Sequence, residues 1–272
     1  MTTHVYIPDT QVKPGIPLDH LDWIGAYLIE KKYDKVIVAG DWYDLPSMSA
    51  WDKGKKAFEG RRYKADVQAG HDALERMWAP IEAANERVRG YKGKQYLPER
   101  HVTWGNHEHR ADRCSENSAE LDGMVGTFEF TDFWKARGWN CHAFKEVLEL
   151  DGIWYSHFFY NPMTGKPWGG MIENRLQKIG NSFTQGHTQT LMHGIRYVGN
   201  RQQHGLVAGA CYLHDEDYKG PQGNHHWRGI VVKHEVRGGA YDPMFVSLDY
   251  LCRRYEQMSL PKFMAEKYGV AA

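Results

Sequence analysis

Five short segments of the chain carry aspartate, asparagine, glutamine or histidine, the residue types that bind divalent metal ions. In chain order they are Asp9-Thr10-Gln11, Asp41-Trp42-Tyr43-Asp44, Asn106-His107-Glu108, the single His157, and His187-Thr188-Gln189. Carboxylate and amide oxygens, together with imidazole nitrogens, form the sites of Mg²⁺, Mn²⁺ and Zn²⁺ in proteins. Each segment alone is common by chance, so the prediction of a metal centre rests on the whole series.

Four of the five segments directly follow a short run of apolar, β-branched or aromatic residues. These runs, residues 5–7, 36–38, 101–104 and 153–155, predict buried strands. Each ligand therefore stands where a strand ends and a loop begins, which is the edge at which α/β sheets place their chemistry.

The remaining pattern predicts helices and further strands around this edge. An amphipathic helix follows Pro17, a second one runs through residues 67–81, and Asp151-Gly152 is a hairpin turn signal. Further strands are expected at 191–198, 206–210, 229–236 and 244–248, and two helices close the chain, the last between Ser259 and Gly269. We expect an α/β fold in a single domain, 1–272: a two-sheet β-sandwich flanked by helices, with the metal site on loops at one edge. Residues 45–90 would form a polar and helical insertion bordering that site.

The series of motifs resembles the calcineurin-like metallophosphoesterase superfamily, whose pattern reads D-x-H, G-D-x-x-D, G-N-H-D/E, a lone H, and G-H-x-H. The chain departs from it at Gln11 and Gln189, which stand where the family has histidines. The motifs span residues 9–189, about two thirds of the chain, and the size and the run 105–110 resemble small virus-encoded members. The chain matches the pattern at Asp9, Asp41, Asp44, Asn106, His107, Glu108, His157, Gly186 and His187.

The resemblance implies a phosphoester hydrolase that holds two divalent ions and acts by in-line attack of a metal-bound hydroxide. Asp41 would bridge the two ions. One site would be completed by Asn106, His157 and His187. The other would be held by Asp9, with Gln11 and Gln189 as candidate partners. Because a glutamine oxygen is a poorer zinc ligand than imidazole, Mn²⁺ suits the Gln11 and Gln189 site best, Mg²⁺ is the alternative, and Zn²⁺ suits it least.

The same resemblance assigns His107 as the acid that protonates the leaving oxygen and Asp44 as the residue that orients it. Arg110, three residues further on, could neutralise a phosphate oxygen through its forked donors. His109 is a candidate substrate contact or an ordinary loop residue.

Two further clusters have open interpretations. The basic stretch 53–64, with Arg61 and Arg62, suits a polyanionic substrate, but interspersed acids make a solvated helix face the stronger alternative. The segment from His214 to His226 offers ligand types in a glycine-rich loop, and could hold an extra metal ion or border the substrate groove.

Composition narrows the class of protein. Lys+Arg and Asp+Glu both number 34 in 272 residues, which argues against a strongly basic protein that coats nucleic acid. The four cysteines lie far apart without a C-x-x-C, and no leader or apolar stretch of about 20 residues is present. We expect a cytoplasmic protein, in the host cytoplasm if virus-encoded, with no membrane contact and no obligate protein partner.

The expected function is a phosphodiesterase or nuclease acting on nucleic acid, DNA or RNA, or on nucleotides. A phosphomonoesterase, including a protein phosphatase, is the alternative within the same chemistry. A catalytically reduced binding subunit is the alternative of another class. Retention of the candidate acid His107 and of one complete ligand set argues against this last one.

Overall fold

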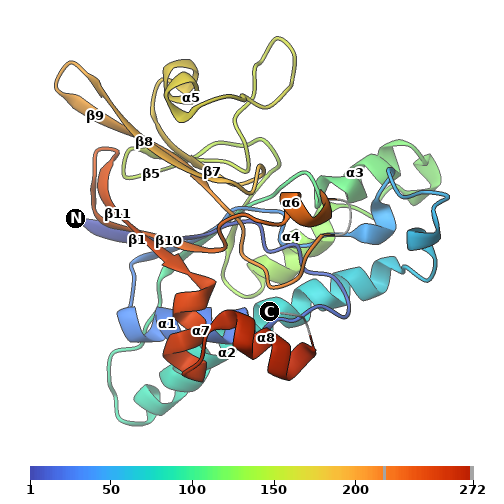
Figure 1. The fold of residues 1–272 in the computed structure, drawn as a ribbon, viewed down its shortest axis with the longest axis horizontal. Coiled ribbons are helices and arrows are strands. Elements are labelled where there is room, and N and C mark those ends of the chain that lie inside the picture. The colour runs from blue at the N-terminus through green and yellow to red at the C-terminus, as the bar shows by residue number, and fades with distance from the viewer. Residues whose placement is uncertain (217–218, 270–272) are drawn as a thin grey trace.

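Two β-sheets face each other at the centre of the molecule in the computed structural model, which describes residues 1–216 and 219–269 (Figure 1). The first sheet has the strand order β11-β10-β1-β2-β3-β4, in which β1 to β4 are parallel and β10 pairs antiparallel with both β1 and β11. Its strands are β1 (Thr2–Ile7), β2 (Lys35–Val38), β3 (Glu99–Thr103), β4 (Asn140–His142), β10 (Gly229–Arg237) and β11 (Ala240–Ser247).

The second sheet has the order β5-β6-β7-β9-β8, with a parallel centre formed by β6, β7 and β9. The outer strands β5 and β8 pair antiparallel to their neighbours. Its strands are β5 (Leu148–Leu150), β6 (Ile153–Tyr155), β7 (Ser182–Gln185), β8 (Leu191–Val198) and β9 (Arg201–Ala208).

Helices cover the outer faces of both sheets (Figure 1). The first sheet is covered by α1 (Asp19–Lys31), α2 (Tyr63–Gly90), α7 (Leu248–Glu256) and α8 (Leu260–Tyr268), and α4 (Thr127–Lys135) packs beside β4. The second sheet is covered by α5 (Ile172–Ile179). Shorter elements are α3 (His109–Glu116), α6 (Gly220–Gly223) and the 3₁₀ turns η1 (Pro46–Met48), η2 (Lys56–Phe58) and η3 (Ala119–Leu121).

Side chains along β1 alternate between two hydrophobic cores. Val5 and Ile7 pack against α1 and α2, whereas Tyr6 packs between the sheets, and all three are fully buried. A strand buried on both faces reads as a continuous apolar run, which explains why the sequence predicts it so clearly.

A fully buried lysine joins the two sheets behind the site. Lys233 on β10 donates from Nζ to the Tyr155 hydroxyl, 3.0 Å, on β6 and to Thr184 Oγ1, 2.5 Å, on β7. Burial lowers the pKa of Lys233 well below its ordinary value. The contact fixes β10 against the two strands that lead to His157 and His187.

The predicted fold class, a two-sheet α/β sandwich flanked by helices, is confirmed. Residues 45–90 form η1, η2 and α2. That this segment is an insertion stays a prediction. The sequence did not predict β4, β7, α3 or α5. The extent of the domain, 1–272, stays a prediction, and residues 217–218 and 270–272 lie outside the described part. Among the described residues no helix combines the length and apolar composition needed to span a bilayer.

Candidate metal centre

Candidate ligands follow five of the strands that end at one edge of the molecule, β1, β2, β3, β6 and β7. In the first sheet β1, β2 and β3 are parallel neighbours, and in the second β6 and β7 are. Since parallel neighbours end side by side, Asp9, Asp41 and Asn106 approach from one sheet and His157 and His187 from the other.

Backbone hydrogen bonds fasten these segments to one another. Gln11 N donates to Asp41 O at 2.8 Å, and Gly186 N donates to His157 O at 3.2 Å. Cys211 N, at the start of the segment after β9, donates to Asp9 O at 2.8 Å. The ligands therefore lie on a hydrogen-bonded frame.

The ligand atoms of Asp41, His157 and His187 all lie within 4.8 Å of one another. His157 Nε2 is 3.3 Å from Asp41 Oδ2 and 3.0 Å from Asn106 Oδ1, while its Nδ1 lies 2.8 Å from the Ala39 carbonyl oxygen. A ring nitrogen held by a backbone carbonyl leaves the other nitrogen directed at a ligand position. These residues have the composition and spacing of a divalent-metal site.

A buried carboxylate, Glu108, shapes the loop that presents Asp41. Its oxygens accept from the backbone N–H groups of Asp41, Tyr43 and Gly105, each at 2.9 Å. Glu108 is fully buried, and sequence reasoning treated it only as part of a motif. Its position directly after His107 is the signal that could have indicated a structural role.

The backbone around the site is strained. Gln11, Asp41, His187 and Gln189 have φ between +45° and +68°, the left-handed region that costs a non-glycine residue about 1–3 kcal/mol. A Cβ on Gly186 would lie 2.1 Å from Asp9 Oδ1, so only glycine permits this approach. Strain clustered in this way is typical of functional sites.

Two buried oxygens at the first segment have no hydrogen-bond partner among the described residues. Asp9 Oδ1 accepts from His187 N at 3.0 Å, but Asp9 Oδ2 and Gln11 Oε1 have none, although both residues are almost wholly buried. Burying an unsatisfied carboxylate oxygen is costly, and a cation would satisfy both atoms. The donor set at Asp9 and Gln11 therefore fits a divalent ion.

Gln189, the other departure from the motif pattern, lies differently. Its Oε1 accepts from the Tyr212 hydroxyl at 2.9 Å and from Lys219 Nζ. Its oxygen is thus engaged by protein donors, whereas that of Gln11 is not.

The pKa values of the groups around Asp41 are shifted because several buried ionisable groups lie close together. Burial, together with the nearby charge of Asp41, raises the pKa of Asp9 to about 6 against the attraction of His157. Burial opposes protonation of His157, but the Asp41 carboxylate raises its pKa to about 9. Burial and the nearby His157 lower the pKa of His187 to about 4. A bound cation would favour the deprotonated, ligating forms of these groups.

His107 stands beside this cluster and is held by Asp44. His107 Nδ1 lies 2.9 Å from Asp44 Oδ1, and its backbone N donates to Asp41 Oδ1 at 2.9 Å. Burial lowers the pKa of His107, but the charges of Asp41 and Asp44 outweigh burial and raise it overall. The geometry is that expected of an oriented acid.

Arg110 touches both members of this pair. Its Nη1 donates to the Asp44 carbonyl oxygen at 2.7 Å, and its Nη2 lies 2.9 Å from His107 Nε2. One arm of the guanidinium is therefore anchored to the loop while the other faces the ring nitrogen that would carry the transferred proton.

A cleft of about 980 Å³ opens beside His107. It is lined on one side by the segment 44–66 and on the other by Lys13 and by residues 214–216. The loop from His214 onward, whose role the sequence left open, thus borders the groove that contains the candidate acid.

The three residues predicted to bind substrate lie in different surroundings. Arg61 lines the cleft, and its Nη1 pairs with Asp52 Oδ2 at 2.8 Å. Arg62 lines the cleft too and is exposed. His109 instead stacks on Phe144, with ring centroids 4.8 Å apart, and is not among the described residues that line the cleft. Their roles in binding stay predictions.

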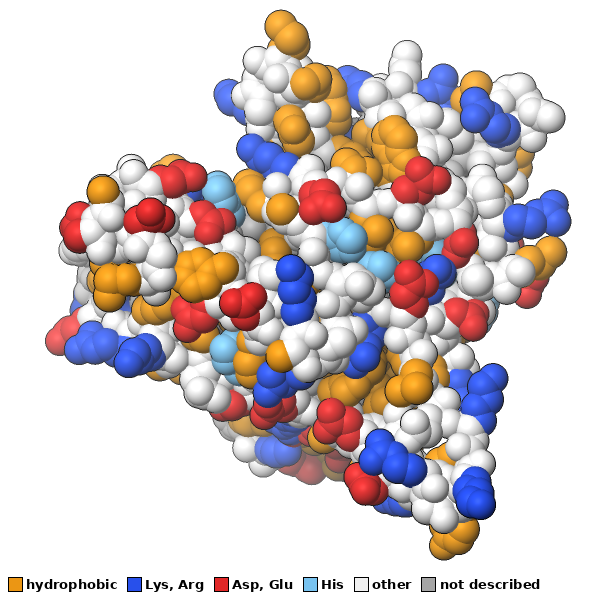
Figure 2. All heavy atoms as spheres, turned by 180° about the vertical axis from the view of Figure 1, so that it is seen from behind, with side chains coloured by type: hydrophobic (Ala, Val, Ile, Leu, Met, Phe, Trp, Pro, Cys, Tyr) orange, Lys and Arg blue, Asp and Glu red, His pale blue; other side chains and the backbone are white. Residues whose placement is uncertain are grey.

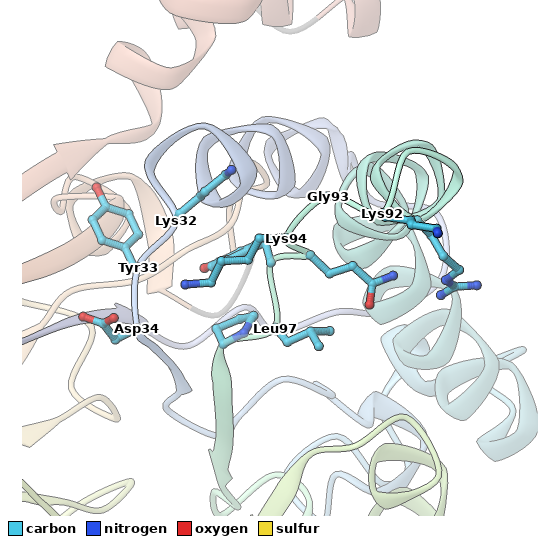
Figure 3. Close-up of a pocket in the computed structure, with 11 residues that line it drawn as sticks. Lys32, Tyr33, Asp34, Lys92, Gly93, Lys94 and Leu97 are labelled. Atoms are coloured by element: carbon cyan, nitrogen blue, oxygen red, sulfur yellow. The ribbon is translucent and has the colours of Figure 1, made fainter.

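A second pocket, of about 740 Å³, lies at the opposite ends of β2 and β3 (Figure 3). Its cations, Lys32, Arg89, Lys92 and Lys94, stand at the carboxyl ends of α1 and α2, where they complement the helix dipoles. None of the candidate site residues lines this pocket. Its positive charge is explained by the position of the cations at the helix ends.

Comparison with known proteins gives distant relatives. No family model matches the chain. The chain is 26% identical to the gene 54 protein of Mycobacterium phage L5 over 205 residues, 73% of this chain and 74% of that protein. It is also 26% identical to the gene 54 protein of Mycobacterium phage D29 over 188 residues, 68% of each.

Solved structures with a similar course of the chain include a novel archaeal phosphodiesterase, with a TM-score of 0.42, 12% identity, and coverage of 90% of this chain and 99% of that one. Another is Yfce, a phosphoesterase from E. coli, with a TM-score of 0.38, 8% identity, and coverage of 90% and 100%.

Proposed function

We propose that this chain is a divalent-metal-dependent phosphoester hydrolase whose preferred substrates are phosphodiesters of nucleic acids or nucleotides. The arrangement around Asp41 carries the proposal. Its Oδ2 lies 3.3 Å from His157 Nε2 and 3.7 Å from His107 Nε2. One carboxylate therefore faces both a candidate metal ligand and the candidate acid.

Asp41 would share one ion with Asn106, His157 and His187 and another with Asp9 and Gln11. Such a pair of ions supplies positive charge for the phosphoryl oxygens and lowers the pKa of an attacking water. Oxygen-rich donors at Asp9 and Gln11 favour Mn²⁺ there, with Mg²⁺ as the alternative.

The protein's own part is to deliver a proton and to hold the phosphate. Asp44 fixes the ring of His107 through Nδ1, which leaves Nε2 to protonate the leaving oxygen. Arg110 keeps its anchor to the Asp44 carbonyl while a phosphate oxygen replaces His107 Nε2 as the partner of its second arm.

A diester is favoured over a monoester by the shape of the site. A diester carries groups on both sides of the phosphorus, and the cleft of about 980 Å³ extends well beyond His107 along the segment 44–66. A phosphomonoesterase is the second candidate, because Arg110 beside the acid suits the extra charge of a terminal phosphate.

The test compares bis(p-nitrophenyl) phosphate with p-nitrophenyl phosphate in metal-free buffer and with added Mn²⁺. We expect metal-dependent hydrolysis, faster for the diester, and a collapse in Asp41→Asn with loss of bound metal. Asp122→Asn, the same change at an exposed position, is the matched control. Full activity without metal, or in Asp41→Asn, would refute the proposal, and a faster monoester reaction would favour the second candidate.

A further inference from the structure

Trp51 differs from the other tryptophans of the chain in its exposure to solvent. Of ten tryptophans, nine are buried or half-buried, whereas Trp51 is 85% exposed. An isolated exposed apolar residue is ordinary on a protein surface, so the position of Trp51 decides its meaning.

Trp51 lines the same cleft as His107 and Asn106. It stands between η1 and η2, on the segment that continues directly from the Asp44 loop. Pro14 and Ile16, from the loop after Asp9, line this cleft too. A flat aromatic surface therefore belongs to the groove that begins at the candidate acid.

The segment that carries Trp51 is braced on both sides. Ser47 N donates to Asp66 Oδ2 on α2 at 2.9 Å, and Arg61 donates to the Pro46 carbonyl oxygen at 3.0 Å and to Asp52 at 2.8 Å. These bonds hold the residues before and after Trp51 while leaving its own ring exposed.

The charged side chains of this cleft do not explain how a substrate would be recognised there. Among the described residues that line it, five basic side chains are balanced by six acidic ones, and Lys13 and Arg61 are already paired with acids. Both signs are also interspersed over the face of the molecule seen in Figure 2. A track for a long phosphate backbone needs uncompensated cations, so the organic part of the substrate must be recognised by another interaction. The five cations are Lys13, Lys55, Arg61, Arg62 and Arg110.

We propose that Trp51 is a stacking surface for an unpaired nucleobase next to the scissile phosphate. Tryptophan stacks on any base through its π-face, whereas a base inside a duplex offers no free face. The site would then take nucleotides or single-stranded ends, with the phosphate at the metal centre and the base on Trp51. This inference rests on the proposed phosphodiester chemistry and adds the class of substrate.

The experiment uses two diesters with the same leaving group, thymidine 5′-(p-nitrophenyl phosphate) and methyl p-nitrophenyl phosphate. In Trp51→Ala we expect the ratio of kcat/KM for the thymidine ester to that for the methyl ester to fall about 5- to 150-fold, the range of base–aromatic stacking. Trp51→Phe should restore most of the ratio. Tyr91→Ala, a truncation of an 89% exposed ring outside the cleft lining, is the matched control and should leave the ratio unchanged.

Binding of thymidine 5′-monophosphate and of inorganic phosphate, measured by calorimetry with Mn²⁺, separates the two proposals. Hydrolysis with an unchanged ratio in Trp51→Ala overturns the stacking role and leaves the phosphodiesterase standing. If the diesters are not hydrolysed but nucleotide binding depends on Trp51, the phosphodiesterase proposal falls and the stacking role stands. If the wild type neither hydrolyses these diesters nor binds the nucleotide more tightly than phosphate, both proposals fall.

Discussion

The ammonium group of Lys13 lies 2.8 Å from Glu216 Oε2, and this contact joins the loop after β1 to the loop after β9 across 203 residues of sequence. The same ammonium lies 3.1 Å from Asp44 Oδ2. Burial lowers the pKa of Lys13, but the two carboxylates outweigh it and raise the pKa overall. Lys13 therefore links the residue that orients His107 to the far wall of the cleft.

Lys13→Met should leave two buried carboxylates without their cation. We expect a loss of about 1–3 kcal/mol of unfolding free energy and a lower kcat, because Asp44 no longer holds its position. Urea unfolding and steady-state kinetics measure the two effects. Lys13→Arg is the conservative control, and the double variant with Glu216→Gln should recover part of the stability. Strictly additive effects would show that the pair is not coupled.

The variant His107→Ala should keep its metal content. Its turnover number for a phosphodiester with an alcohol as the leaving group should fall about 10²- to 10⁴-fold. The loss should be much smaller for p-nitrophenyl esters, whose leaving group needs no proton. Metal analysis alongside the kinetics checks both statements. Asp122→Ala, at an exposed position, is the control and should have a small effect. Loss of metal in His107→Ala would mean that the residue is a ligand.

Gln11 and Gln189 should not contribute equally to metal binding. Because only Gln11 has an oxygen without a protein partner, Gln11→Ala should raise the Mn²⁺ concentration needed for half-maximal activity by about 10-fold, and Gln189→Ala by less. Gln11→His should tighten the same site, since imidazole is the stronger ligand. Equal shifts in the two alanine variants would contradict this distinction.

The burial of His20 leads to a prediction of how the free energy of unfolding depends on pH. His20 is fully buried, and burial together with the charge of His214 lowers its pKa to about 3. The unfolded chain binds this proton near pH 6.5, so stability is complete above that pH and falls by about 1.4 kcal/mol per unit as the pH drops towards 3.

The measurement is urea unfolding at pH 7 and pH 5. The variant His20→Gln, which cannot titrate, should lose about 2 kcal/mol less than the wild type over this interval. His225→Asn, on an exposed histidine, should follow the wild type. An unchanged pH dependence in His20→Gln would assign acid sensitivity to other groups.

Four of the five ligand segments follow a strand that the sequence predicts, whereas the fifth, with His187, could be found only through the motif pattern. Asp9, Asp41 and Asn106 come after apolar runs, and local pattern was sufficient for them. The strand β7, Ser182–Gln185, leads to His187 but has only one apolar residue, Phe183, and one of its polar residues, Thr184, bonds Lys233 between the sheets. No periodicity reveals such a strand.

Contacts between distant segments could not be predicted in this way. The ion pair of Lys13 and Glu216 and the three backbone bonds to Glu108 depend on how the loops meet in space. The engagement of Gln189 by Tyr212 is of the same kind, and it separates two glutamines that are equivalent in the motif.

The candidate ligands come from both sheets, and this has a consequence for the mechanics of the molecule. An ion held by Asp41 from one sheet and His157 from the other is a cross-link over the seam between them, at the end opposite the hairpin of Asp151. Sheet separation and ion release then become coupled equilibria, and the midpoint of sheet separation moves with the free ion concentration. A chelator would act as a denaturant of this seam, and cleavage by proteases would begin in the loops that the ion holds together.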